Sequence, residues 1–312
     1  MNNQNKPRFD MYFAGNGIKD VEDTIINQNI NKLLSFINDR GAIEKYIEHK
    51  KNGWKGKLLI DSGAFSIHKS GKQANLDVYI DYLNKNHEYL DYYIQLDNIP
   101  GKWGVPTSKQ EILESPEKTW QNYLYMRSKL IDKDKLLPVF HQLEDFKYLK
   151  RMLEYEDEYG KIKYMCIASN KQLSTNDRID WYKRCFDIIE RSSNPNIMIH
   201  SLGTQSKTHC EMFPFTSVDA TSWIMTGANG HIYSPWGTVG ISEQQFNRPG
   251  NVTTKSFYPR LLDYINKKGF NLEDLKQKPG ERQRWNLIYL NDWAKNERVY
   301  KGPQSYKINT LF

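Results

Sequence analysis

The sequence predicts an α/β protein whose single domain is a TIM-type (β/α)8 barrel. Short apolar runs alternate along the chain with longer stretches in which apolar residues repeat at helical spacing. There are about eight such runs, and 312 residues are enough for one large barrel domain. A doubly wound open sheet would give the same alternation and is the alternative architecture.

The apolar runs are the expected strands, and the amphipathic stretches between them are the expected helices. One helix should open at Ser115 and Pro116, because proline is favoured at the first helical position. We expect one domain over residues 1–312, with a helical C-terminal segment from about 254 to 312. The strands are expected at 11–14, 57–60, 92–96, 136–140, 164–168, 196–200, 217–219 and 231–233, and the helices at 21–37, 76–90, 115–130, 145–155, 176–189, 257–265 and 272–275.

The composition favours a cytoplasmic protein with a basic surface. The chain has 44 Lys and Arg against 37 Asp and Glu, a net charge of +7 that suits a nucleic acid without requiring one. Residues 276–284 are basic and break the helical pattern, which indicates a solvated turn or, alternatively, a phosphate contact. Cys166, Cys185 and Cys210 contain no CxxC pair, which argues against a disulfide framework or a Cys-rich zinc site. The sequence has no signal-peptide core and no membrane-spanning run, so no membrane partner is expected.

Three carboxylates stand at the ends of predicted strands, namely Asp61, Asp97 and Asp219. Desolvating an unpaired carboxylate is costly, so acids in such positions indicate a functional site. In (β/α)8 barrels the active site is built from strand carboxyl ends and the loops after them. His141, Ser169 and Gly203 are expected at the same edge.

A pair of carboxylates facing a sugar carbon can perform glycosidic chemistry. One carboxylate attacks C1′ as the leaving group departs, and the other transfers the proton. If Asp61 and Asp219 face each other, the substrate could be an O-glycoside, a nucleoside or a base within a polynucleotide. Each acid also has a structural interpretation, as a helix cap or a turn residue.

The motifs around these acids resemble those of tRNA-guanine transglycosylases. Asp61-Ser-Gly-Ala-Phe65 is similar to the family's Asp-Ser-Gly-Gly-(Phe/Tyr) element, and Leu96-Asp97 is similar to its base-reading aspartate after a hydrophobic strand. Pro138-Val-Phe-His-Gln142 lies where the family has a strand ending in Gln-Gly. His200-Ser-Leu-Gly203 is similar to its strand ending in a glycine turn.

The resemblance continues through the end of the predicted barrel. Asp219 takes the place of the family's nucleophile, and Asn229-Gly-His-Ile-Tyr233 follows at the distance of a similar family element. Together the motifs span roughly residues 55–235, and their order and spacing are more specific than any one of them.

This resemblance implies roles for individual residues. Asp219 would be the nucleophile that forms a covalent glycosyl intermediate, and Asp61 the general acid and base. Asp97 would accept hydrogen bonds from guanine N1 and N2, and Phe65 would stack on the purine. The remaining residues expected to contact the base are Ser62, Gly63, His141, Gln142, Ala168, Ser169 and Gly203.

The chain also departs from the family pattern. The CxCxxC zinc subdomain is missing, the Pro-Thr-Arg run after the nucleophile is replaced by Ser222-Trp223-Ile-Met-Thr226, and Ile167-Ala-Ser169 replaces a Gly-Gly strand end. These changes look more like the DpdA-type DNA 7-deazaguanine transglycosylases of bacteria and phages. That likeness implies exchange of guanine in DNA for a free 7-deazaguanine base such as 7-cyano-7-deazaguanine. It implies no metal and no cofactor, and for a phage protein the host cytoplasm as the compartment.

The sequence leaves several alternatives open. The nucleic acid could be tRNA instead of DNA, and the same carboxylate pair could serve a nucleoside or glycoside hydrolase that uses water. The chain could also be a non-catalytic nucleic-acid-binding partner subunit, and a homodimer is one assembly it could form. Trp223 and Trp236 could line a nucleic-acid channel, but core packing is the expected role.

Overall fold

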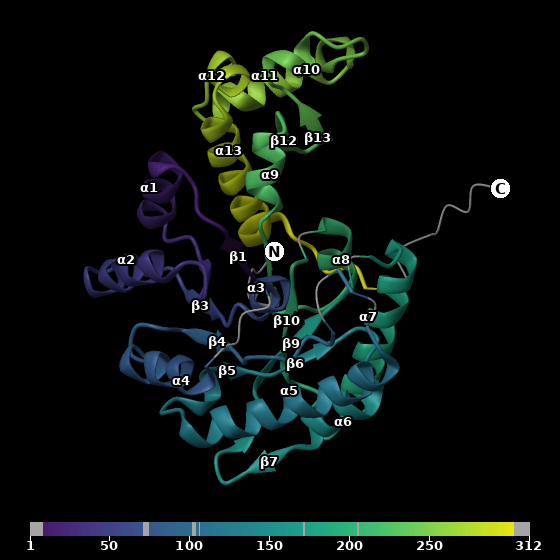
Figure 1. Cartoon of the computed structure of the whole chain (residues 1–312). Coiled ribbons are helices and arrows are strands. Elements are labelled where there is room, and N and C mark those ends of the chain that lie inside the picture. The colour runs from purple at the N-terminus through teal and green to yellow at the C-terminus, as the bar shows by residue number, and fades with distance from the viewer. Residues whose placement is uncertain are drawn as a thin grey trace, which may run out of the picture.

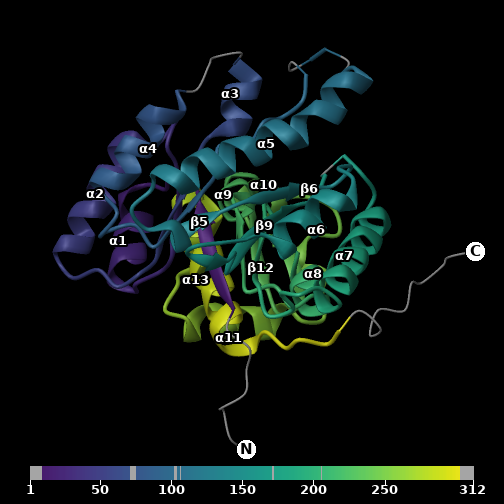
Figure 2. The same ribbon diagram turned by 90° about the horizontal axis from the view of Figure 1, so that it is seen from below.

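The protein is an α/β molecule built on a nearly closed, barrel-like parallel sheet (Figures 1 and 2). The computed structural model describes residues 9–70, 75–101, 104–105, 107–170, 172–204 and 206–302. Nine strands hydrogen-bond in the order β5-β4-β3-β2-β1-β11-β10-β9-β6, and all eight pairings are parallel. The strands are β1 (Asp10–Ala14), β2 (Lys32–Ser35), β3 (Leu58–Asp61), β4 (Tyr92–Ile94), β5 (Leu136–Leu137), β6 (Val139–His141), β9 (Tyr164–Ala168), β10 (Met198–Leu202) and β11 (Ser217–Ala220).

The two ends of this strand order meet around Pro138. The end strands β5 and β6 are consecutive in the chain, and only Pro138 separates them. On one side Gln95 N donates to Leu137 O (3.0 Å), and on the other Cys166 N donates to Pro138 O (2.7 Å). Proline has no N–H to add to a ladder, which explains why the ladder is interrupted there. The sheet therefore curls round until its two edges share one stretch of chain.

Helices connect successive strands on the outside of the sheet (Figures 1 and 2). Several of these helices begin at side-chain caps. Asn75, Ser108, Asp145 and Ser174 each accept hydrogen bonds from backbone N–H groups in the first turn of the following helix. The helices of this layer are α1 (Lys19–Asn27), α2 (Arg40–Lys51), α3 (Ala64–Ser70), α4 (Leu76–Lys85), α5 (Lys109–Lys129), α6 (Phe146–Glu154), α7 (Thr175–Glu190) and α8 (Lys207–Met212). No helix in the described part of the chain is both long and apolar enough to cross a membrane.

Alternate residues of each strand build two different cores. The smaller core fills the inside of the sheet, and the larger one lies between the sheet and the helices. Side chains of the inner core include Tyr12, Ala14, Leu33, Leu59, Ile94, Leu137, Val139, Tyr164 and Cys166. Asp61, His141 and Asp219 continue the same alternation from Leu59, Val139 and Ser217, so they also face inward.

Residues 222–297 form a lobe beside the sheet, drawn above it in Figure 1. Its centre is Asn286, whose Oδ1 accepts from Tyr233 N (2.8 Å) and whose Nδ2 donates to Trp223 O (3.3 Å) and His231 O (3.2 Å). The lobe contains α9 (Ser222–Ala228), the hairpin β12 (His231–Ser234) and β13 (Gly237–Gly240), α10 (Glu243–Phe246), a 3-10 turn (Val252–Thr254), α11 (Tyr258–Lys267), α12 (Leu272–Gln277), α13 (Pro279–Asp292) and a π-helical turn (Trp293–Glu297).

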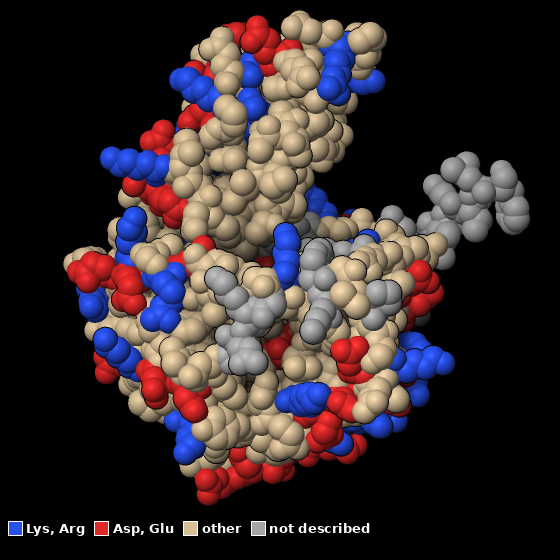
Figure 3. Space-filling view, viewed as in Figure 1, with Lys and Arg blue, Asp and Glu red and all other residues tan. Residues whose placement is uncertain are grey.

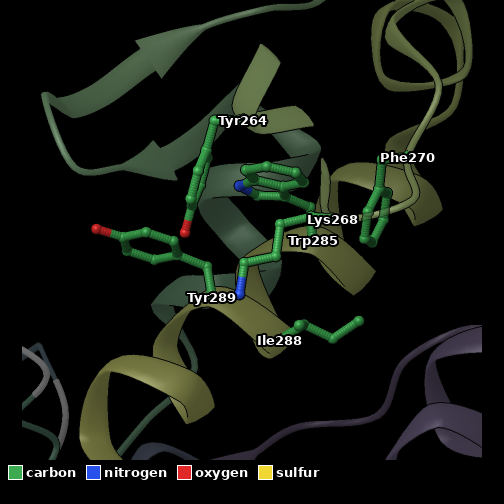
Figure 4. A pocket seen from close by; sticks show the side chains of 6 residues that line it. All are labelled: Tyr264, Lys268, Phe270, Trp285, Ile288 and Tyr289. Atoms are coloured by element: carbon green, nitrogen blue, oxygen red, sulfur yellow. The ribbon is translucent and has the colours of Figure 1, made fainter. Parts of the chain in front are cut away.

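The lobe packs through aromatic rings (Figure 4). The rings of Tyr264 and Phe270 meet Trp285 edge-on, with centroids 5.7 and 5.1 Å away. The hollow between them has a volume of about 10 Å³, which is about the space of one water, so these rings form packing and not a base-binding pocket.

Several sequence-based expectations about elements were wrong. The expected helix at 21–37 ends at Asn27 and is followed by β2, a strand of the sheet that was not expected. The expected strand at 231–233 is β12, which pairs only with β13 in the lobe. The helix expected to open at Ser115 begins at Lys109 and contains Pro116. The expected turn at 276–284 is largely α13, and there Arg282 is buried against three backbone carbonyls.

Candidate active site

The three strand-end acids lie close enough for their charges to interact. Asp61 ends β3, Asp219 lies near the end of β11, and Asp97 follows β4. Burial raises the pKa of the Cys166 thiol, and the charges of Asp219, Asp61 and Asp97 raise it further. Cys166 points into the inner core, so the three carboxylates lie around one region above it.

Asp219 is held by two hydrogen bonds to the same oxygen. Gly203 N donates to Asp219 Oδ1 (2.8 Å), and His200 Nε2 lies 3.1 Å from that atom. Gly203 follows β10 with a φ of +63°, a conformation that glycine adopts without strain. The Asp219 side chain is 11% exposed, and no described residue donates to Oδ2. The carboxylate is therefore fixed through one oxygen while the other stays available.

His200 belongs to a buried chain of polar groups inside the sheet. Its Nδ1 hydrogen-bonds to Ser217 Oγ, which in turn bonds to the hydroxyl of Tyr164. His200 and Ser217 have no exposed surface, and they are paired across β10 and β11. A carboxylate can only accept, so His200 Nε2 carries the proton toward Asp219, and Nδ1 can then accept from Ser217. The chain thus fixes both the tautomer of His200 and the position of Asp219.

Asp61 is the acid most disturbed by its surroundings. Burial raises its pKa, and so do the charges of Asp97 and Asp219, while a hydrogen bond from Gly63 N (3.1 Å) opposes the shift; the result is a pKa of about 7. At neutral pH Asp61 is therefore divided between acid and carboxylate, which is the condition for a general acid and base. The adjacent Ser62 is buried, and its hydroxyl has no partner among the described residues.

Asp97 is paired with His141. Asp97 Oδ2 lies 2.8 Å from His141 Nε2, and Glu144 Oε1 lies 2.9 Å from His141 Nδ1. Burial opposes the positive charge on this ring, but the hydrogen bonds to Asp97 and Glu144 outweigh it and raise the pKa of His141 to about 10. His141 is therefore an imidazolium at neutral pH, with both N–H groups directed at carboxylates.

The other expected contact residues divide into two groups. Ala168 is paired with His141 and with Leu202, so it lies on the same inward face as the acids. Phe65 is on α3 and is 59% exposed. Gln142 instead braces a loop: its Oε1 accepts from Asn170 N (2.9 Å) and its Nε2 donates to Asp177 O (3.3 Å). Ser169 forms a hydrogen bond with the buried hydroxyl of Tyr182, which is likewise a structural role and not a contact with a base.

The roles of four residues in this site were not predicted from the sequence, namely those of His200, Ser217, Tyr164 and Glu144. Strand alternation was the available signal for two of them. His200 precedes Gly203 in a predicted strand, and Ser217 stands two residues before Asp219, so both could have been placed on one face. Glu144 lies in a turn, where spacing says nothing about direction.

The arrangement suits proton transfer and nucleophilic attack. It offers one carboxylate held through a single oxygen, a second with a pKa near neutrality, and a third beside an imidazolium. No group of three or more His, Cys, Asp or Glu is arranged to hold a metal ion within the described residues.

Comparisons with known proteins do not place this chain in a family. No protein-family model matches the chain, and no curated protein matches it. Among solved structures, it is similar to the carboxyl transferase domain of Rhizobium etli pyruvate carboxylase, with 10% identity over 96% of this chain and 50% of that one, at a TM-score of 0.38. A protein described as a 3-oxoacyl-reductase from Bacillus thuringiensis is 12% identical over 69% of this chain and 96% of that one, at a TM-score of 0.28.

Proposed function

We propose that this protein is a transglycosylase that exchanges guanine in DNA for a 7-deazaguanine base through a covalent aspartyl-glycosyl intermediate. In this proposal the nine-stranded sheet counts as a (β/α)8 barrel, because β5 and β6, which are separated only by Pro138, together form one of the eight barrel strands. Support comes from the carboxylates at the strand ends and from the resemblance of their motifs to the transglycosylase family.

The observation that carries the proposal is the difference between the surroundings of Asp61 and those of Asp219. The charge of Asp219 helps to raise the pKa of Asp61 to about 7, after the larger effect of burial. Asp219 meanwhile accepts two hydrogen bonds at Oδ1. Two nearby carboxyl groups in different environments are the usual basis for dividing nucleophile from acid.

The first half-reaction removes guanine. Asp219 Oδ2 attacks C1′ of the target nucleotide, and the bond from C1′ to guanine N9 breaks as the bond to Oδ2 forms. Asp61 in its protonated form supplies the proton that the departing base requires. Because a duplex hides C1′, the nucleotide must be extruded or already single-stranded, and Phe65 offers an exposed ring on which the base can stack.

The second half-reaction inserts the new base. The 7-deazaguanine gives its N9 proton to Asp61, now a carboxylate, and N9 attacks C1′ while the ester bond to Asp219 breaks. Asp97 accepts hydrogen bonds from N1–H and the 2-amino group of either base, and the His141 ring, 2.8 Å from Asp97 Oδ2, fixes the position of the carboxylate. Two displacements at C1′ retain the configuration of the nucleoside.

A trapping experiment tests the proposal. The protein is incubated with guanine-containing DNA and a 7-deazaguanine analogue, and a denaturing gel is run for a covalent protein–DNA complex. The complex should form with the wild type and be absent for Asp219→Asn. Nucleoside mass spectrometry of the product DNA should show the deazaguanine nucleoside. Loss of guanine without insertion would indicate a hydrolase, and modification of tRNA alone would indicate the tRNA reaction.

A further inference from the structure

The lobe carries more positive charge than its share of the chain length. Residues 222–297 carry 10 Lys and Arg against 7 Asp and Glu, so this quarter of the chain holds three of the seven net positive charges. In Figure 3 a group of Lys and Arg atoms lies at the far end of the lobe, where Figure 1 places α10. Charge distributed in this way creates a local positive field that the total of +7 does not describe.

Three exposed cations of the lobe that form no ion pair among the described residues lie in one stretch. Residues 244–262, here called the basic arm, contain Arg248, Lys255 and Arg260 and no acid. All three side chains belong to exposed residues, and none forms an ion pair within the described part of the chain. The helices that follow are different. Five of the six cations in residues 263–292 are neutralised locally, by the pairs Lys267–Asp263, Lys268–Asp292, Lys276–Glu273, Lys278–Asp274 and Arg284–Glu281, and the sixth, Arg282, is buried against backbone carbonyls.

The basic arm is an ordered framework. The rings of Trp236 and Phe257 stack with an interplanar angle of 1° and centroids 5.6 Å apart, and the Arg260 guanidinium lies 5.6 Å from the Trp236 centroid. Asn251 caps the turn beside them by accepting from Thr253 N (2.9 Å), and Val252 is buried beneath it. The three cations are therefore displayed from fixed backbone positions, which reduces the entropy lost when they bind an extended partner.

A polar hollow of about 650 Å³ adjoins the basic arm. Arg248 and Lys276 line it together with Ser242, Gln245 and His231, and Glu243 is its single acid. Amide, hydroxyl and cationic groups are the side chains that contact phosphate and sugar in nucleic-acid complexes. The hollow thus extends the polar and basic surface of the arm toward the hairpin β12–β13.

We propose that the basic arm binds the sugar-phosphate backbone of the duplex DNA substrate, outside the catalytic residues. This inference rests on the proposed function, since it supplies the DNA contact which that reaction needs outside the catalytic residues. Cations without local acids gain more from a polyanion than paired ones, because they give up no existing partner. Three phosphate contacts would also contribute to binding without reading sequence.

The test is fluorescence anisotropy with a labelled 30-base-pair duplex at several salt concentrations. The variant is the triple substitution Arg248→Gln, Lys255→Gln and Arg260→Gln. A matched control removes the same charge from exposed lysines on the outer helices, with Lys45→Gln, Lys118→Gln and Lys183→Gln. The arm variant should bind about tenfold or more weakly at physiological salt, and the slope of log affinity against log salt should fall by about 2–3 units. The control should stay within about twofold of the wild type.

The outcomes separate this inference from the proposed function. If the wild type binds DNA through the arm but never exchanges guanine, the inference stands and the transglycosylase proposal fails. If exchange occurs and the arm variant binds duplex DNA with the wild-type affinity and salt slope, the inference is overturned. It is also overturned if the wild type binds no duplex DNA, or if the arm matters for tRNA and not for DNA. Thermal melting of both variants should match the wild type, because none of the substituted side chains is buried.

Discussion

His200 Nε2 lies 3.1 Å from Asp219 Oδ1, and His200 itself is fully buried inside the sheet. The same oxygen accepts the N–H of Gly203, so the two donors together set the direction in which Oδ2 points. His200 is in turn fixed by Ser217, whose hydroxyl bonds to Tyr164. In the proposed reaction His200 is a positioning residue: it touches the nucleophile and not the substrate.

Removing the His200 donor should slow formation of the covalent intermediate. We expect His200→Phe to lower the rate of this step by about 10- to 100-fold, because a hydrogen bond to a charged group contributes about 1.5–3 kcal/mol. The KM for DNA should change little, since His200 is buried away from any DNA contact. Single-turnover kinetics on the denaturing gel measures the step directly.

His200→Gln is the matched variant, because a glutamine amide can still donate toward Asp219. It should recover most of the lost rate, whereas a general loss of packing would affect both variants alike. Wild-type rates for His200→Phe would show that the hydrogen bond has no role in the reaction.

Asp61 should make the stability of the protein depend on pH. Its pKa is about 7 in the folded protein, against 3.8 for an aspartate in water. As pH rises from 4 to 7 the unfolded chain ionises this group while the folded protein keeps it protonated, so the free energy of unfolding falls. Asp61→Asn removes that loss and should stabilise the protein by about 4 kcal/mol at most above pH 7, and hardly at all below pH 4.

Urea unfolding of wild type and Asp61→Asn at pH 4, 6 and 8 measures this difference. Asp180→Asn is the control, because that side chain is 72% exposed on α7. A stabilisation by Asp61→Asn that is the same at all three pH values would contradict the raised pKa of Asp61.

The sequence was enough to predict that Asp61, Asp97 and Asp219 lie at the same edge of the sheet. Each follows or ends an apolar run, and such runs mark the strands. Strand β2 was not predicted, because the spacing of apolar residues cannot distinguish a very short strand from the end of a helix. Lys32-Leu-Leu-Ser35 is a four-residue strand whose leucines also fit helical spacing after α1, so periodicity could not separate the two. Lys32 is a cation at a position with no exposure, where it bonds to Gly15 O (2.6 Å) and Glu22 (3.2 Å). A lysine in a sequence is normally expected on the surface, so the burial of Lys32 could not be predicted without knowing that Glu22 and Gly15 O bind it.

The partners within the site were also beyond prediction from the sequence. His141 and Asp97 could be named as separate candidates, but their 2.8 Å contact joins residues 44 positions apart. Gln142 was expected to meet a base, yet both ends of its amide bond to backbone groups of the next loop and helix. Side-chain direction at the last residue of a strand depends on the loop that follows, and loop geometry is not encoded in periodicity.

Asp97 should determine the preference for a 2-amino purine. In the proposed reaction its carboxylate accepts from guanine N1–H and the 2-amino group, while hypoxanthine lacks the second donor. Asp97→Asn should reduce the preference for guanine over hypoxanthine by about 10- to 100-fold, corresponding to about 1–3 kcal/mol for a paired contact. Competition between the two labelled bases for incorporation measures the ratio. His141→Gln keeps a donor to Asp97 and should have the smaller effect, and an unchanged ratio in Asp97→Asn would remove Asp97 from base recognition.

Position 63 should not tolerate any side chain, and a substitution there should also disturb the position of Asp61. Its φ is +85°, and a Cβ there would come within 2.7 Å of Ile37 Cγ1 and 2.9 Å of Ser35 Oγ. We expect Gly63→Ala to destabilise the protein by about 1–3 kcal/mol, because the strained backbone and the clash add together. Gly41→Ala is the control on helix α2: a Cβ at that position would have no atom within 4 Å, and alanine there should stabilise by up to about 1 kcal/mol. Since Gly63 N donates to Asp61, Gly63→Ala should also shift the pH dependence of the first half-reaction, which a purely structural glycine would leave unchanged.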